Sequence, residues 1–158
     1  MNDNKQKIKY PYIPSGRSIE YVPSDNIYML MAKKYAREHS LDDVMPTASV
    51  IVNDGNVVAM GANGSDYHKK NECERVKNNI PTGQGYELCE GCHPKNHSEI
   101  TAVSKLDNAT DAYDADLYLW GHWWCCELCW NAIIDAGIKR IFLVEGSERM
   151  FNKEHPEN

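Results

Sequence analysis

His97-Ser98-Glu99, followed by Cys126-Glu127-Leu128-Cys129, is the part of the sequence that decides its fold class and its chemistry. One histidine and two cysteines supply three ligands for a tetrahedral zinc ion. Such a set leaves the fourth position open to water, which distinguishes a catalytic zinc site from a structural one. Glu99 follows closely enough to move protons beside that water. Each motif opens a helical pattern, so the sequence predicts two helix N-termini that meet at one metal ion.

The expected chemistry follows from the charges of these ligands. Cys126 and Cys129 lie on one face of a helix, and the positive end of the helix dipole favours their thiolate forms. Two thiolates and a neutral imidazole balance the charge of Zn²⁺, and the ion lowers the pKa of its bound water toward neutrality. Glu99 can carry that water's proton to a ring nitrogen and then to a leaving amine. The set suits hydrolytic loss of ammonia from an amino-substituted heterocycle. A closed structural zinc site, with His122 or Cys125 as fourth ligand, would leave Glu99 without a role.

Length and composition limit the class of protein. The chain has 158 residues, which we interpret as one domain spanning 1–158, and a formal net charge of −6 from 17 basic and 23 acidic residues. This balance makes a nucleic-acid partner unexpected, although a local basic cluster could serve a small anionic substrate. We find no apolar leader and no run of ~20 apolar residues that would cross a membrane. The six cysteines therefore indicate metal binding in a cytoplasmic protein rather than disulfides.

The periodicity of apolar residues predicts an alternating α/β chain. Residues 1–23 are predicted to be an irregular arm, and Ser24-Asp25 to cap a helix that ends near Ser40. Ile27, Leu30, Met31 and Tyr35 recur on that helix at helical spacing. The strands are expected at 48–53 and 57–61, joined by an Asp54-Gly55 turn, and at 116–120 and 140–144. Further helices are expected from Ser98, over 126–136 with Gly137 at its end, and in the tail from Glu148. Residues 62–96 form a Cys-rich insertion without clear periodicity.

The chain resembles the zinc-dependent cytidine and deoxycytidylate deaminase superfamily, and most of all the deoxycytidylate (dCMP) deaminases. The resemblance covers 50–144, including Gly61-Ala62-Asn63-Gly64, the two zinc motifs and the segment 132–139. His-x-Glu followed by Pro-Cys-x-x-Cys is the known signature of zinc deaminases. The resemblance implies a three-layer α/β/α sandwich of the cytidine deaminase type, with a mixed central sheet of about five strands. It also implies zinc on His97, Cys126 and Cys129, proton transfer by Glu99, and contact of Asn63 with the substrate sugar.

The resemblance carries a function with it. It implies that dCMP is hydrolysed to dUMP and ammonia, with a zinc-bound hydroxide attacking C4 of the base. Deamination of another aminated base, a nucleoside, a triphosphate or a short RNA keeps the same chemistry, and a zinc-stabilised binding module is the non-enzymatic alternative. The family further implies a homo-oligomer, often a hexamer, and in many members dCTP and dTTP as effectors.

The chain departs from the family pattern on one side of the expected pocket. The proline that usually precedes the first cysteine is Cys125 here, and the segment 117–124 is longer and more aromatic. Trp120 and its aromatic neighbours could stack on a base, but Trp123 and Trp124 fit core or subunit contacts equally well. Ser98 and Tyr86 are further candidates for substrate contact, Tyr86 by family analogy alone.

The insertion carries a second set of metal-ligand residues. Cys73, Cys89 and Cys92 are not used by the first site, and a second structural zinc bound to them and His68 would fasten 62–96. His93 competes with His68 for the fourth position, and three reduced cysteines without metal are the alternative. Some dCMP deaminases are similar in carrying an extra zinc here. The insertion also holds cations that could meet a phosphate but are more often simply solvated: Lys69, Lys70, Arg75 and Lys77.

Overall fold

One mixed sheet organises the chain. The computed structural model describes residues 11–80 and 85–152, and within them five strands form a sheet in the order β1-β5-β4-β2-β3. β5 pairs in parallel with both β1 and β4, whereas β2 is antiparallel to both β3 and β4. The strands are β1 (Ile19–Val22), β2 (Ala48–Asn53), β3 (Asn56–Ala62), β4 (Asp116–Trp120) and β5 (Arg140–Val144). The predicted mixed sheet of about five strands is confirmed.

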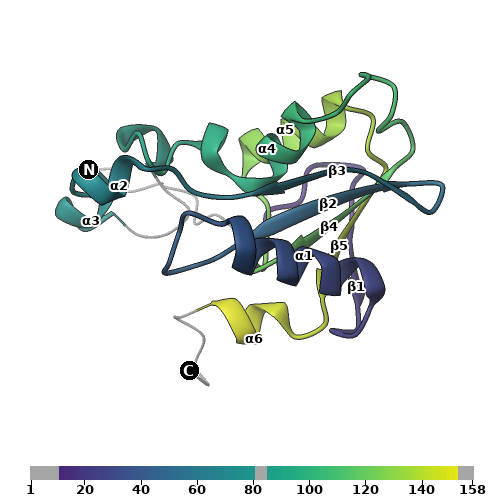
Figure 1. Ribbon diagram of the computed structural model, residues 1–158, viewed down its shortest axis with the longest axis horizontal. Helices are drawn as coiled ribbons and strands as arrows, with labels where there is room; N and C mark the ends of the chain where they lie inside the picture. Colours follow the sequence, from purple (N-terminus) through teal and green to yellow (C-terminus); the bar gives the residue numbers. More distant parts are fainter. Residues whose placement is uncertain (1–10, 81–84, 153–158) are drawn as a thin grey trace.

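Helices cover both faces of this sheet, which makes the three-layer sandwich that the sequence predicted (Figure 1). Helices α4 (Ser98–Ser104) and α5 (Glu127–Asp135) lie on one face, and α1 (Ile27–His39) and α6 (Ser147–Phe151) lie on the other. Successive side chains of a strand point to opposite faces. Leu117 and Leu119 of β4 accordingly pack with Trp130 of α5, whereas Tyr118 packs with Met29 of α1. Each fully buried large apolar side chain contributes roughly 1.5–3 kcal/mol to this packing.

Local chemistry explains where the elements begin and turn. Asp54 and Gly55 join β2 to β3 with φ values of 50° and 77°, as a type I′ hairpin turn requires. The side chain of Asn26 accepts hydrogen bonds from the backbone N–H groups of Tyr28 and Met29. The cap of α1 is therefore Asn26 and not the predicted Ser24-Asp25 pair.

The buried face of α1 also differs from the predicted one. The structure buries Met29, Ala32 and Ala36, and it leaves Ile27 and Leu30 exposed at 66% and 46%. The two alanines let the helix backbone approach the sheet closely, and this packing outweighs the larger apolar area of Ile27 and Leu30.

The predicted irregular arm contains a strand. β1 lies within 1–23, and its backbone pairs with β5 in parallel, from Ile19 opposite Ile141 to Val22 opposite Val144. The edge of β5 supplies the hydrogen-bond partners that a four-residue segment lacks on its own. Residues 1–10 of the arm lie outside the described part of the chain.

The insertion has only short pieces of regular structure. They are α2 (Tyr67–Lys70), α3 (Glu74–Lys77) and the 3₁₀-helices η1 (Tyr86–Leu88) and η2 (Pro94–Asn96), while 81–84 lie outside the described residues. Of the helices in the described ranges, none has the length and apolarity needed to cross a membrane.

Candidate active site

The two zinc motifs stand at the N-termini of adjacent helices. His97 is the N-cap of α4, and Cys126 is the N-cap of α5. Both helices cover the same face of the sheet (Figure 1), so their first turns lie close together. The Cys126 sulfur accepts a hydrogen bond from the backbone N–H of Cys129 at 3.4 Å, which fixes the first turn of α5 around both sulfurs.

The structure brings His97, Cys126 and Cys129 together with the spacing that a tetrahedral ion needs. Nδ1 of His97 lies 3.6 Å from the sulfur of Cys126 and 3.5 Å from the sulfur of Cys129. Bonds of about 2.0–2.1 Å to nitrogen and about 2.3 Å to sulfur place tetrahedral ligands roughly 3.5 Å apart. The donor set and its distances therefore fit one zinc ion.

Neither proposed fourth ligand joins this group. Among the described residues, the ligand atoms that lie within 4.8 Å of one another here belong to His97, Cys126 and Cys129 alone. Cys125 is fully buried in the apolar core, where burial raises the pKa of its thiol well above the usual value. This arrangement favours an open site over the closed structural site considered from the sequence.

Glu99 lies beside the three ligands, almost out of contact with solvent. Glu99 is only 5% exposed, and this burial raises the pKa of its carboxyl. The carboxylate oxygen Oε2 lies 3.6 Å from the sulfur of Cys129 and 3.4 Å from the hydroxyl of Ser98. The Ser98 hydroxyl in turn lies 2.8 Å from that of Ser49 on β2. Glu99 is thus held at the metal-ligand group by the first turn of α4.

The charge distribution favours a metal ion at this group. A hydrogen bond with the Cys129 thiol lowers the pKa of Cys126 to about 4, so that Cys126 is a thiolate near neutral pH. Burial opposes protonation of His97, but the hydrogen bond to Cys126 and the charge of Glu99 raise the pKa of His97 above its usual value. Negative charge therefore gathers where a cation would lie.

A cavity of about 840 Å³ opens onto this group. Its volume falls within the range of roughly 300–1,000 Å³ that small-molecule sites occupy. The lining includes Glu99 and three of the predicted substrate contacts, Asn63, Ser98 and Tyr86. Lys69, Lys70 and Arg75 also line the cavity, whereas Lys77 is absent from its lining.

Asn63 is largely occupied by contacts within the protein. Its Oδ1 accepts hydrogen bonds from the backbone N–H of Thr47 at 2.9 Å and from the hydroxyl of Ser40 at 2.5 Å. Its Nδ2 donates to the carbonyl of Met45 at 3.0 Å. An asparagine amide carries two N–H groups, so one donor remains after these bonds.

Trp120 lies on the wrong face of the sheet for substrate contact, which corrects the prediction. Its ring packs edge-on against Phe151 of α6 with centroids 5.1 Å apart, and Lys33 of α1 lies over it. Adjacent residues of β4 alternate between faces, so Trp120 points away from the layer that carries Glu99. Trp124, rather than Trp120, lines the cavity.

From the sequence, His122 was singled out only as a possible zinc ligand, within a segment 117–124 expected along one side of the pocket, and the structure places it in the cavity wall. Nδ1 of His122 accepts hydrogen bonds from the backbone N–H groups of Trp123 at 3.0 Å and Trp124 at 3.2 Å. Burial, together with the charge of His97, lowers the pKa of His122 to about 4. The ring is therefore neutral, with its proton on Nε2.

The insertion forms a second group of potential ligands, His68, Cys73, Cys89 and Cys92, which we term the insertion cluster. Their ligand atoms all lie within 4.8 Å of one another, with His68 Nε2 3.2 Å from the Cys89 sulfur and the Cys73 and Cys92 sulfurs 3.5 Å apart. Gly91 makes room for the imidazole, because a Cβ there would lie 2.6 Å from His68 Nε2.

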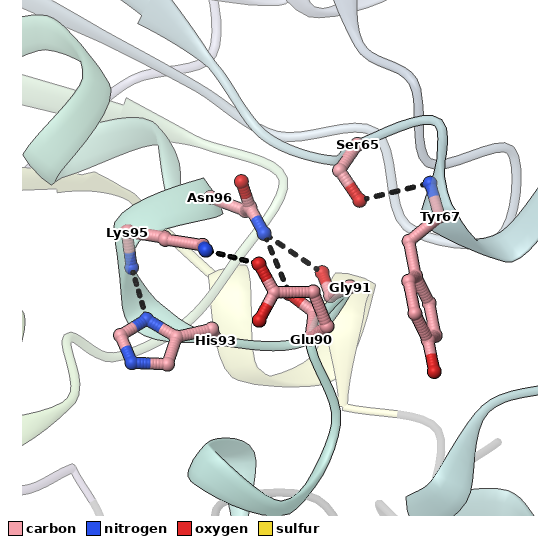
Figure 2. Close-up of polar contacts among 7 residues, drawn as sticks. All are labelled: Ser65, Tyr67, Glu90, Gly91, His93, Lys95 and Asn96. Carbon is pink, nitrogen blue, oxygen red and sulfur yellow. Dashed lines mark hydrogen bonds and ion pairs between the residues drawn. The ribbon is translucent and has the colours of Figure 1, made fainter.

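His93 is engaged elsewhere. Its Nδ1 accepts a hydrogen bond from the backbone N–H of Lys95 at 3.1 Å, capping η2 (Figure 2). Of the two histidines considered from the sequence, the structure places His68 with the three cysteines.

The chain matches one protein family and is similar to several solved structures. No curated protein sequence matches the chain. Similar solved structures include a dCMP deaminase from cyanophage S-TIM5 (20% identity, 80% of this chain and 87% of that one, TM-score 0.49). Others are guanine deaminase from Bacillus subtilis (22% identity, 78% and 66% covered, TM-score 0.45) and RibD from Acinetobacter baumannii (18%, 73% and 26%, TM-score 0.44). The family model for the cytidine and deoxycytidylate deaminase zinc-binding region matches residues 23–145. The chain therefore belongs to the cytidine and deoxycytidylate deaminase family.

Proposed function

We propose that this protein is a zinc-dependent hydrolase that converts dCMP to dUMP and ammonia. The observation that carries the proposal is the position of Glu99, a buried carboxyl that lines a large cavity and lies 3.6 Å from the sulfur of Cys129. A structural metal site has no need of such a group, whereas hydrolytic deamination needs a carrier of protons beside the attacked ring.

The reaction exchanges an amino group for an oxygen at the ring carbon C4. Zinc held by His97, Cys126 and Cys129 would supply a Lewis acid and a water molecule of lowered pKa. Glu99 takes a proton from the attacking water and delivers it to ring nitrogen N3. It then transfers the second proton of that water to the amino group, so that the C–N bond breaks and ammonia leaves. Ser98 and the first turn of α4 hold the carboxylate in place for both transfers.

We infer that His122 helps to select the base. Its Nδ1 is committed to two backbone N–H groups, and within the described part of the chain no group is seen to accept a hydrogen bond from Nε2. A cytosine ring offers its O2 carbonyl as an acceptor for that proton. Trp124, on the same wall, adds an aromatic surface for the base.

The remaining nucleotide contacts follow from the cavity lining. The free N–H of Asn63 suits a sugar hydroxyl, while its other hydrogen bonds fasten the loop that leads into β2. Lys70 and Arg75 line the cavity and suit a phosphate. Lys69 is already paired with Asp66 at 3.1 Å and Arg75 lies over the Tyr86 ring, and so we assign the phosphate first to Lys70.

We also propose that the insertion cluster binds a second, structural zinc ion. Three cysteines and one histidine form a closed tetrahedral set. Burial opposes ionisation of the Cys89 thiol, but its hydrogen bonds with His68 and with neighbouring groups together lower the pKa of Cys89 to about 6, which favours the thiolate that a metal requires. The ion would fasten an insertion whose helices α2 and α3 have four residues each.

A substrate panel tests this proposal. Ammonia release would be measured with dCMP, dCTP, CMP, deoxycytidine, cytosine and guanine, on protein whose zinc content has been determined. We expect dCMP to have the highest kcat/KM. Lys70→Ala should raise the KM for dCMP more than that for deoxycytidine, whereas the matched variant Lys77→Ala, outside the cavity, should change neither. Absence of turnover on the whole panel by zinc-loaded protein would refute the dCMP assignment. The homo-oligomer and the dCTP and dTTP effectors stay predictions. Adding either nucleotide to the same assay tests the effectors.

A further inference from the structure

A backbone carbonyl connects the insertion cluster to the catalytic centre. Nε2 of His97 donates a hydrogen bond to the carbonyl oxygen of Cys92 at 3.2 Å. That bond places the ring proton on Nε2 and leaves the lone pair of Nδ1 directed at Cys126 and Cys129. The partner of a metal-binding histidine orients the ring and tunes its affinity for the ion. The backbone carbonyl of Cys92 is that partner for His97.

The position of that carbonyl depends on the insertion cluster. The Cys92 sulfur lies 3.5 Å from that of Cys73 and 3.8 Å from His68 Nε2, and the Cys92 N–H donates to the Cys89 carbonyl at 3.1 Å. One bound ion would therefore hold the Cys92 backbone from both sides of the Cys-x-x-Cys turn.

Hydrogen bonds and an ion pair hold the loop between Cys92 and His97 in a fixed conformation. Asn96 donates to the carbonyl of Glu90 at 2.9 Å, and Lys95 pairs with the Glu90 carboxylate (Figure 2). The backbone N–H of His97 donates to the carbonyl of Pro94 at 2.9 Å. These bonds close a compact turn between the two groups of ligands.

A second contact reaches His97 from the same insertion. The ring of Tyr86 meets the His97 imidazole edge-on with centroids 4.9 Å apart, and the guanidinium of Arg75 lies 4.4 Å from the centre of the Tyr86 ring. Arg75 follows Cys73 closely in sequence, and Tyr86 closely precedes Cys89. Two segments that support His97 are therefore anchored next to ligands of the insertion cluster.

We propose that the metal ion of the insertion cluster is a positioning element of the catalytic centre, because it fixes the carbonyl and the ring that orient His97. The inference rests on the second metal and the catalytic centre proposed above. It makes the two sites energetically coupled: each ion is held more tightly when the other is bound. Loss of a partner that orients a metal-binding histidine lowers metal affinity by about 10- to 100-fold, and we expect an effect of that size.

The test measures metal retention rather than activity. The full chain would be loaded with zinc, its metal content determined, and the catalytic ion withdrawn by competition with a chromogenic chelator. Wild type should hold two ions per chain. Cys89→Ser should hold one, and that ion should be bound about 10- to 100-fold more weakly than the catalytic ion of wild type. His68→Gln keeps all three cysteines and alters an exposed side chain, so it is the substitute test if Cys89→Ser does not fold. It should also weaken zinc binding at the catalytic site.

Lys77→Ala is the matched control, because it alters an exposed side chain of the same insertion, changes no ligand and breaks none of the contacts between Cys92 and His97. It should retain both ions with wild-type affinity. One ion per chain in wild type would overturn the proposal, and so would a cluster variant whose remaining ion is bound as tightly as in wild type. If the ions behave as proposed and dCMP is not turned over, the inference stands and the proposed reaction fails.

Discussion

Replacing Gly61 with alanine should displace helix α4 and, with it, Glu99. Gly61 of β3 lies directly beneath α4, and a Cβ there would come within 2.3 Å of the Ala102 nitrogen and 2.7 Å of the Ser98 carbonyl oxygen. Ordinary contacts begin at 3.4 Å, so the helix backbone would have to retreat by about 1 Å. Both obstructing atoms are backbone atoms, which cannot rotate out of the way as a side chain does.

The size of the effect follows from this displacement. Overpacking a well-filled contact costs about 1–3 kcal/mol of folding free energy. A catalytic group misplaced by about 1 Å costs on the order of 100-fold in rate. The variant should therefore fold with reduced stability, and its kcat for dCMP should fall by on the order of 100-fold.

Urea unfolding and dCMP turnover on zinc-loaded protein measure the two effects separately. Gly55→Ala is the control, because Gly55 has a φ of +77° and no atom within 4 Å of the added Cβ. It should lose about 1–2 kcal/mol through backbone strain and keep its kcat. A Gly61→Ala variant with wild-type kcat would refute the view that the contact of α4 with β3 positions Glu99.

Three further predictions concern the cavity wall and the sheet. In the folded protein the pKa of His122 is about 4, so its ring is neutral near pH 7. As the pH falls from 6.5 toward 4, the unfolded chain binds a proton on His122 and the folded chain does not, so the free energy of unfolding decreases. About 2 kcal/mol of unfolding free energy should therefore disappear between pH 7 and pH 5 in wild type but not in His122→Gln, and parallel urea curves would contradict this. Asn63→Ala should lose about 2–3 kcal/mol, since three hydrogen bonds contribute about 1 kcal/mol each, and an unchanged urea midpoint would exclude their role. Trp120→Ala should lower stability by about 3 kcal/mol at an unchanged KM for dCMP, and a raised KM would return Trp120 to the substrate pocket.

Strongly patterned elements could be predicted from the sequence. The strands at 48–53, 116–120 and 140–144 were predicted with the bounds that the structure has, because buried apolar runs with nearby turn residues leave few alternatives. The four-residue strand β1 could not be predicted, because a polar segment with Glu20 becomes a strand only by pairing with the edge of β5. Its state is set by residues more than a hundred positions away in the chain.

The candidate site could also be predicted from the sequence only in part. His97, Cys126 and Cys129 meet because each motif begins a helix on one sheet face, which local spacing predicts. His68 was preferred to His93 from the sequence, and the structure places it with the three cysteines, but this meeting depends on the tertiary course of the insertion. Trp120 was misplaced because a shift of one residue along a strand moves a side chain to the opposite face.

The most direct test of the proposed reaction compares dCMP turnover by wild type and Glu99→Gln, each with its zinc content measured. The amide occupies nearly the same volume but cannot carry a proton, and general acid–base catalysis contributes about 10²- to 10⁴-fold. We predict that the variant keeps its zinc and loses at least about 100-fold in kcat. A variant that retains zinc and turns over dCMP at the wild-type rate would contradict the role of Glu99 and with it the proposed mechanism.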